Sequence, residues 1–238
     1  MRLTIGFDGD DTLWHNETIF SMTQEKFREM LGPLSGSADP DERLLAVERA
    51  NLRLFGYGIK GFVLSMIETA IEVTQGRIAA HDIQRLIDFG KAMLDHPVEL
   101  LDGVTETLEA LSSAHDLILI TKGDLFDQES KLARSGLIPR FAAIEIVSEK
   151  DPATYRRVLG RHGIDPARFV MIGNSLRSDV LPVIEIGGRA IHVPYHVTWA
   201  HEHVEEPEGS VPTAQSILDV PTLIEGLRPN PPTEPGPG

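Results

Sequence analysis

The sequence predicts an α/β fold, in which a parallel β-sheet core of five or more strands is interrupted by an inserted all-helical domain. Three observations predict it. Short apolar runs of strand length recur along the chain, helical apolar patterns separate the later runs, and residues 16–96 contain no convincing strand. Strands that alternate with helices form parallel sheets covered on both faces, and ligands bind beyond the carboxyl ends of their strands.

The expected strands are five apolar runs bounded by turn or polar residues: 3–7, 117–120, 143–147, 169–172 and 190–193. Helices are expected between the later runs. Val104, Leu108 and Leu111 show the helical spacing, as do apolar residues at 155–162 and 180–187. This βα alternation makes one core from two separate stretches of the chain.

The long segment after the first run is expected to be helical. Val63, Met66 and Ala70 form one apolar stripe, and Ile83, Leu86 and similar residues form another. We therefore divide the chain into a core of residues 1–15 and 97–228, a helical domain of residues 16–96, and a proline-rich, disordered tail of residues 229–238. Such an insert would sit over the acids that follow the first strand.

Composition excludes several classes of protein. The chain has 238 residues with 36 acidic and 22 basic side chains, a formal net charge of −14, which disfavours nucleic-acid and anionic-membrane partners. It has no cysteine, so disulfides and thiolate chemistry are excluded. No window approaches a membrane span, and the N-terminus lacks the pattern of a signal peptide, so we expect a cytoplasmic protein. The oligomeric state is left open.

Polar side chains of a particular kind follow the predicted strands. Asp8 and Asp10 follow the first, Thr121-Lys122-Gly123 the second, Lys150 the third, and Gly173-Asn174 with Asp179 the fourth. Acids for a metal, a hydroxyl for phosphate oxygens and a lysine against developing charge are the groups that phosphoryl transfer uses. Alone, the acids at 8–11 would more simply form a turn.

Four ordered motifs resemble the haloacid dehalogenase superfamily of hydrolases: F-D-G-D-D-T-L at 7–13, L-I-T-K-G at 119–123, S-E-K-D-P at 148–152, and M-I-G-N-S-L-R-S-D at 171–179. Each motif is weak alone, and the ordered set is specific. The resemblance implies a Rossmann-like core, and the position of the insert matches the helical cap of the family's first cap class.

The resemblance also implies roles. Asp8 would attack phosphorus and form an aspartyl phosphate, and Asp10 would act as general acid and then base. Thr121 and Gly123 would bind phosphate, and Lys150 would neutralise charge. Asp179, Asp8 and the carbonyl of Asp10 would hold Mg²⁺. The implied enzyme is a Mg²⁺-dependent phosphatase of a small phosphorylated metabolite.

Two residues depart from the family pattern. Asn174 stands where an acid is usual, which removes a charge from the metal site, although an amide oxygen can still ligate Mg²⁺. Which of Asn174 and Asp179 would bind directly is left open. Lys122 stands where asparagine is frequent, and we expect it to bind the phosphate or the leaving group.

Other activities stay open. The namesake dehalogenases generally lack the second acid and need no metal, so Asp10 favours a phosphatase, while a phosphomutase would also need Asp10. A receiver-like phospho-acceptor module and a silent member that binds through its cap are two non-enzymatic alternatives. A receiver has no insert after its first strand, which argues against that alternative. Asn174 is the one feature that favours a catalytically silent family member.

Two further signals have simple structural explanations. The glycines of 56–61 match a dinucleotide fingerprint, but no strand precedes them, so a loop between helices is expected. Tyr57 and Lys60 on this loop are candidate specificity residues. Histidines cluster at positions 192–203, where a polar loop is a simpler interpretation than a metal site.

Overall fold

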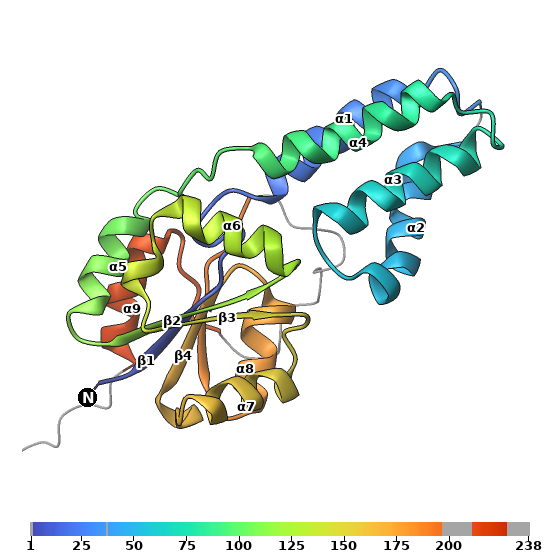
Figure 1. The fold of residues 1–238 in the computed structure, drawn as a ribbon. Helices are drawn as coiled ribbons and strands as arrows, with labels where there is room; N and C mark the ends of the chain where they lie inside the picture. Colours follow the sequence, from blue (N-terminus) through green and yellow to red (C-terminus); the bar gives the residue numbers. More distant parts are fainter. Residues whose placement is uncertain (1, 37, 197–210, 228–238) are drawn as a thin grey trace, which may run out of the picture.

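The computed structural model describes residues 2–36, 38–196 and 211–227. Within these ranges, the strands form one parallel sheet in the order β3-β2-β1-β4-β5 (Figure 1). The strands are β1 Thr4–Phe7, β2 Asp116–Lys122, β3 Ala143–Val147, β4 Phe169–Gly173 and β5 Arg189–His192. The predicted fold class, an α/β protein with a parallel sheet, is confirmed.

Helices make up most of the remaining described chain. The α-helices are α1 Glu17–Leu31, α2 Pro40–Phe55, α3 Ile59–Val73, α4 Ala80–Asp95, α5 Val104–Ser112, α6 Leu125–Ser135, α7 Pro152–Arg161, α8 Leu181–Glu185 and α9 Val220–Gly226. Shorter helical turns are η1 Ile138–Arg140, η2 Pro166–Arg168, η3 Leu176–Val180 and η4 Ile217–Asp219. No described helix combines the length and the apolar character that crossing a bilayer would require.

The sheet buries both of its faces. Alternate residues of one strand point to opposite faces, so Leu119 packs on the side of α5 and α9, whereas Ile118 packs on the side of α7 and α8. Each face has its own apolar cluster, which explains why the strands read as continuous apolar runs rather than alternating ones. A fully buried leucine or isoleucine contributes roughly 1.5–3 kcal/mol.

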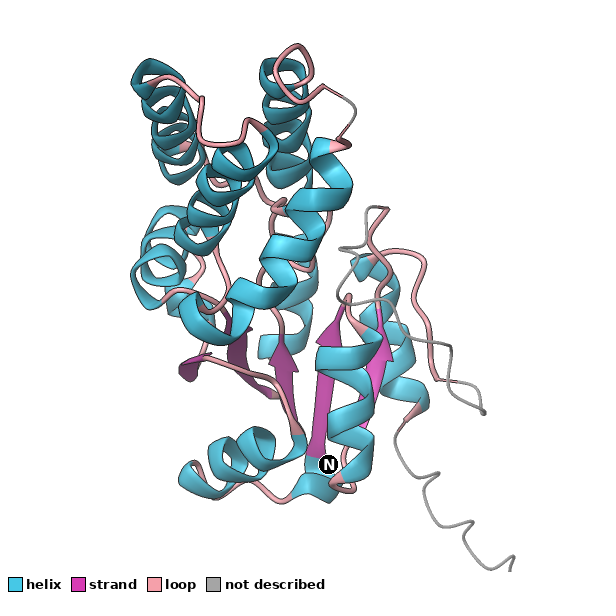
Figure 2. Cartoon of the chain, turned by 90° about the vertical axis from the view of Figure 1, so that its right-hand side faces the viewer, coloured by secondary structure: helices cyan, strands magenta, loops and turns pink. Residues whose placement is uncertain are grey.

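Helices α1–α4, which we call the insert, follow β1 and have a core of their own. Phe27, Leu44, Met66 and Leu86, one from each helix, are among its buried residues. Figure 2 shows the insert beyond the arrowheads of the strands, on the side where the strands end. The domain boundaries expected at residues 16 and 96 flank these helices, and the tail expected at 229–238 lies outside the described residues.

The parallel register brings the ends of four strands together. Phe7 pairs with Leu119 and Ile172, so the acids after Phe7 lie beside the ends of β2 and β4. Strand β2 runs further than the predicted 117–120, because Thr121 and Lys122 still pair with β3 despite their polar side chains. Polar groups from distant parts of the sequence therefore share one edge of the sheet.

Candidate active site

A cavity lies at this edge, between the sheet and the insert. Eight of the ten residues predicted for the site line it: Asp8, Asp10, Tyr57, Lys122, Gly123, Lys150, Asn174 and Asp179. Thr121 is fully buried next to it and does not line it. The insert contributes Phe20 and Gly58 as well as Tyr57, so a ligand here would contact both parts of the chain.

Asp8, Lys150 and Asp179 form a buried cluster of charges. The Lys150 ammonium lies 2.6 Å from Asp179 Oδ1 and also forms a close ion pair with Asp8. Asp8 is 7% exposed, Lys150 4% and Asp179 1%, so water screens these charges very little. One lysine therefore faces two carboxylates, and the cluster carries an excess negative charge.

Burial shapes the ionisation of this cluster. Desolvation raises the pKa of Asp8 to about 7, with Asp179 and Asp10 adding repulsion while Lys150 opposes the shift. Desolvation disfavours the charged form of Lys150, but attraction to Asp179 and Asp8 outweighs it and raises the pKa of Lys150. A cation placed beside Asp8 would favour its ionised, nucleophilic form.

Residues of the loops after β1 and β4 hold the acids in place. Thr12 donates its hydroxyl towards Asp8 Oδ2 at 3.3 Å and accepts from the main-chain N–H of Asn174 at 3.1 Å. The Ser175 amide donates to Asp179 Oδ2 at 3.1 Å. A Cβ atom on Gly173 would lie 2.2 Å from that same oxygen, so a side chain there would displace Asp179.

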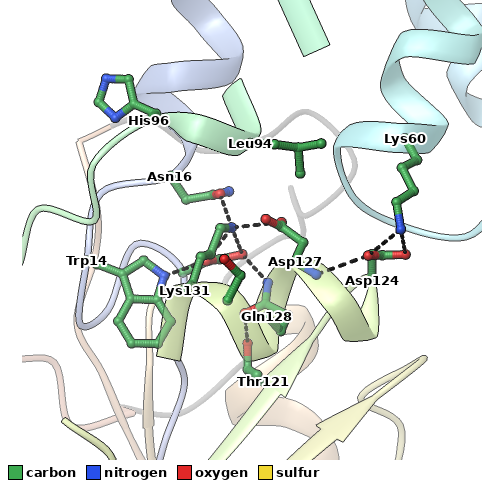
Figure 3. A network of polar contacts seen from close by, with 12 residues as sticks. Trp14, Asn16, Lys60, Leu94, His96, Thr121, Asp124, Asp127, Gln128 and Lys131 are labelled. Atoms are coloured by element: carbon green, nitrogen blue, oxygen red, sulfur yellow. Dashed lines mark hydrogen bonds and ion pairs between the residues drawn. The ribbon is translucent and has the colours of Figure 1, made fainter. Parts of the chain in front are cut away.

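Asp10 lies on the side of the cavity that faces α6. Its carboxylate accepts from Trp14 Nε1 at 2.6 Å and from Gln128 Nε2 at 2.8 Å, and it pairs with Lys131 Nζ at 3.0 Å. Figure 3 shows that Trp14, Gln128 and Lys131 lie close together. Asp8 and Asp10, two residues apart in sequence, therefore have different cationic partners.

Lys131 is a buried cation that sequence reasoning missed. Burial disfavours its charged form, but attraction to Asp10 and Asp127 outweighs this effect and raises the pKa of Lys131. Gln128 was missed too, and its carbonyl oxygen accepts from the Thr121 hydroxyl at 3.2 Å. The signal in the sequence is a polar face at 124, 127, 128 and 131, which has helical spacing and directly follows a strand end.

Asp11 supports the insert. It adopts a left-handed φ of 60°, and its carboxylate accepts from the main-chain amides of Asn16 and Glu17 at 2.9 and 3.0 Å, where α1 begins. Burial raises the pKa of Asp11 to about 7. Burial and nearby Asp11 and Glu48 also raise the pKa of Glu17, which lines the cavity, to about 8.

Lys122 connects the core with the insert. Its ammonium lies 3.1 Å from Ser178 Oγ and 4.1 Å from the centre of the Tyr57 ring. The Tyr57 hydroxyl in turn donates to Glu149 at 2.7 Å. Lys122 and Tyr57 both line the cavity and contact each other.

Lys60 is placed differently from the expectation. It does not line the cavity, because its exposed ammonium pairs with Asp124, the N-cap residue of α6, at 2.9 Å. Gly56 and Gly58 lie in a loop between α2 and α3. This is the loop that was predicted because no strand precedes these glycines. Lys60 therefore joins the insert to the core instead of facing a ligand.

The histidine cluster lies partly outside the described residues, which include His192 and His196 but not His201 and His203. His192 Nε2 lies 2.9 Å from the main-chain oxygen of Asn174. In the described part of the chain, no three His, Cys, Asp or Glu side chains are grouped in a way that could hold a metal. A metal in the cavity would need amide or main-chain oxygens as well.

Comparison with known proteins identifies the family to which the chain belongs. The family of haloacid dehalogenase-like hydrolases matches residues 3–187. A haloacid dehalogenase-like family hydrolase from Xanthomonas campestris is 48% identical, with a TM-score of 0.83 over 94% of this chain and 91% of its own. The chain therefore belongs to the haloacid dehalogenase-like hydrolases and is an enzyme of that family. No curated protein matches the sequence.

More distant structures share the fold and differ in the activity that they are named for. A 2-haloacid dehalogenase from Pseudomonas syringae pv. tomato is 21% identical, with a TM-score of 0.64 over 95% of this chain and 99% of its own. A predicted phosphoglycolate phosphatase from Haemophilus somnus is 16% identical, with a TM-score of 0.61 over 94% and 98%. The fold alone leaves the reaction open, and the side chains must decide it.

Proposed function

We propose that this hydrolase is a Mg²⁺-dependent phosphatase, which cleaves a small phosphorylated metabolite through an aspartyl phosphate on Asp8. The observation that carries the proposal is the second acid, Asp10, which lines the same cavity as Asp8. A phosphate ester leaves an alkoxide that needs a proton, whereas a halide ion leaves without one. A dehalogenase would need no proton donor at this position.

In this scheme each residue has a separate task. Asp8 attacks phosphorus while the Asp10 carboxyl gives its proton to the leaving oxygen, and Asp10 then takes a proton from the water that hydrolyses the aspartyl phosphate. Lys150, which contacts Asp8, offsets negative charge between the nucleophile and the phosphate. Lys122 and the Gly123 amide would bind phosphate oxygens, with Thr121 behind them.

The oxygen donors of the site fit Mg²⁺, which prefers carboxylate and carbonyl ligands. Asp8, Asp179, Asn174 and the main-chain carbonyl of Asp10 would hold it. Burial, with a smaller contribution from neighbouring acids, raises the pKa of Asp8, and a cation beside it would favour its ionised form. When bound, Mg²⁺ would reduce the repulsion between the attacking carboxylate and the phosphate.

The test is a comparison of two leaving groups. We expect purified protein to release inorganic phosphate from at least one member of a broad panel of phosphomonoesters, with activity lost in EDTA and restored by Mg²⁺. The same protein should release no halide from 2-chloropropionate or other 2-haloacids. Halide release that EDTA does not affect, with no phosphate release from any ester, would establish the dehalogenase alternative instead.

A further inference from the structure

The carboxylate of Asp10 is restrained on both of its oxygens. Oδ1 accepts from Trp14 Nε1 at 2.6 Å and from Lys131 Nζ at 3.0 Å, and Oδ2 accepts from Gln128 Nε2 at 2.8 Å and from Lys131 Nζ at 3.2 Å. Two of these three donors come from consecutive turns of α6 (Figure 3). Because donors approach from both ends of the carboxylate, rotation of the Asp10 side chain would break several hydrogen bonds at once.

Lys131 is built into this site rather than attached to its surface. Lys131 is 7% exposed, and its ammonium also contacts Asn16 Oδ1 at 2.7 Å and Asp127 Oδ2 at 3.3 Å. A buried ammonium is costly unless it is paired and hydrogen-bonded. Its partners come from the β1 loop, from the segment that enters the insert, and from α6 itself, so its position is fixed from three directions.

Gln128 links Asp10 to Thr121. The Gln128 amide nitrogen donates to Asp10 Oδ2 at 2.8 Å, and its carbonyl oxygen accepts from the Thr121 hydroxyl at 3.2 Å. Gln128 is 2% exposed, so water does not compete for these bonds. The Gln128 side chain thus sets the distance between Asp10 and Thr121, which is expected to bind the phosphate.

We propose that Lys131 and Gln128 are positioning residues, which hold Asp10 where its carboxyl meets the leaving oxygen of a phosphate ester. The inference rests on the proposed phosphatase function and goes beyond it, because it assigns a catalytic purpose to the buried polar face of α6. Neither residue touches the reacting phosphorus. Both act through the orientation of Asp10.

Such a role has a signature that a purely structural role lacks. An alkyl phosphate releases a strongly basic alkoxide, which needs the proton of Asp10 as its bond to phosphorus breaks. 4-Nitrophenolate is a weak base and leaves without that proton. A displaced Asp10 should therefore slow hydrolysis of alkyl phosphates much more than hydrolysis of 4-nitrophenyl phosphate.

The experiment measures kcat/KM for both kinds of ester in the Lys131→Met variant of the full chain. We expect a loss of about 10²-fold or more with an alkyl phosphate and of less than about 5-fold with 4-nitrophenyl phosphate. Lys131→Arg, which keeps the charge, should recover part of the loss. Lys91→Met is the matched control, because Lys91 is exposed on α4 and pairs only with Asp88 among the described contacts.

A double-mutant cycle with Asp10→Asn gives the second readout. If Lys131 acts through Asp10, Lys131→Met should cause little further loss in the Asp10→Asn background. An equal loss with both esters, or an undiminished loss in that background, would overturn the positioning role. If Lys131→Met does not fold, the neutral change Gln128→Leu carries the same test and must show the same selective loss.

These outcomes separate the two proposals. A wild type that hydrolyses phosphate esters while its variants lose activity uniformly would overturn only the positioning role. A wild type that hydrolyses no phosphate ester would overturn the phosphatase function and the positioning role with it.

Discussion

Replacing Asp8 with asparagine is expected to lower phosphate release by about 10³-fold or more, because it removes the group that attacks phosphorus. Asparagine has nearly the same shape as aspartate, so Lys150 keeps its contact with Asp179 and the sheet edge keeps its packing. The measurement is kcat on the best ester of the panel, with circular dichroism to show that the variant is folded.

Asp88→Asn is the control for this substitution, because Asp88 is exposed on α4, pairs with Lys91 and does not line the cavity. It should retain the wild-type rate. A folded Asp8→Asn variant that still releases phosphate within tenfold of the wild-type rate would show that another residue is the nucleophile.

Replacing Lys150 with methionine should have the largest effect on stability. The change leaves Asp8 and Asp179 buried and facing each other without their shared cation, and breaking a buried pair in this way costs about 3–5 kcal/mol. The free energy of unfolding, measured by urea denaturation in EDTA, should fall by that amount at alkaline pH. Activity should fall by about 10²-fold or more, because the charge beside the nucleophile is lost.

The pH dependence of this loss has a definite sign. Burial already raises the pKa of Asp8 to about 7 in the folded protein, and without Lys150 that pKa would rise further. Below the raised pKa the carboxyl is neutral and repels Asp179 less, so the destabilisation should be smaller at pH 6 than at pH 8.5. A free energy of unfolding within about 1 kcal/mol of the wild type at pH 8.5 would contradict the charge cluster.

The sequence was sufficient to place the strand-end residues, because each lies on the segment that follows an apolar run. All strands of a parallel sheet end at the same edge. Asp8, Asn174 and Lys150 could therefore be assigned to that edge once the sheet was known to be parallel. The site residues on these loops are therefore where the sequence predicts them, and eight of ten line one cavity.

Helix α6 shows what the sequence could not provide. Asp127 and Lys131 have the i, i+4 spacing of an ordinary surface pair, yet they are 3% and 7% exposed, while Leu125 and Phe126 are 58% and 69% exposed. The polar face of this helix points inward because it covers the acids at the sheet edge. Binary patterning predicts the opposite orientation, so the polar face at 124, 127, 128 and 131 indicates a buried site only when it is combined with the strand end that precedes it.

Lys60 was misplaced for a related reason. The loop at Gly56 and Gly58 does reach the cavity and carries Tyr57 there, but α3 begins at Ile59 and turns the next residue outward to Asp124. Side-chain direction changes within a residue or two of a helix start, and the spacing of glycines does not determine it.

The central claim is that a phosphoryl group passes through Asp8. Wild-type protein can be mixed with Mg²⁺ and its best ester, quenched in acid during turnover, digested, and analysed by mass spectrometry. The proposal predicts one phosphoryl group on the Asp8 side chain in the wild type and none in Asp8→Asn. Continued turnover of the wild type with Asp8 unmodified in every rapidly quenched sample, or with the phosphoryl group on another residue, would contradict it.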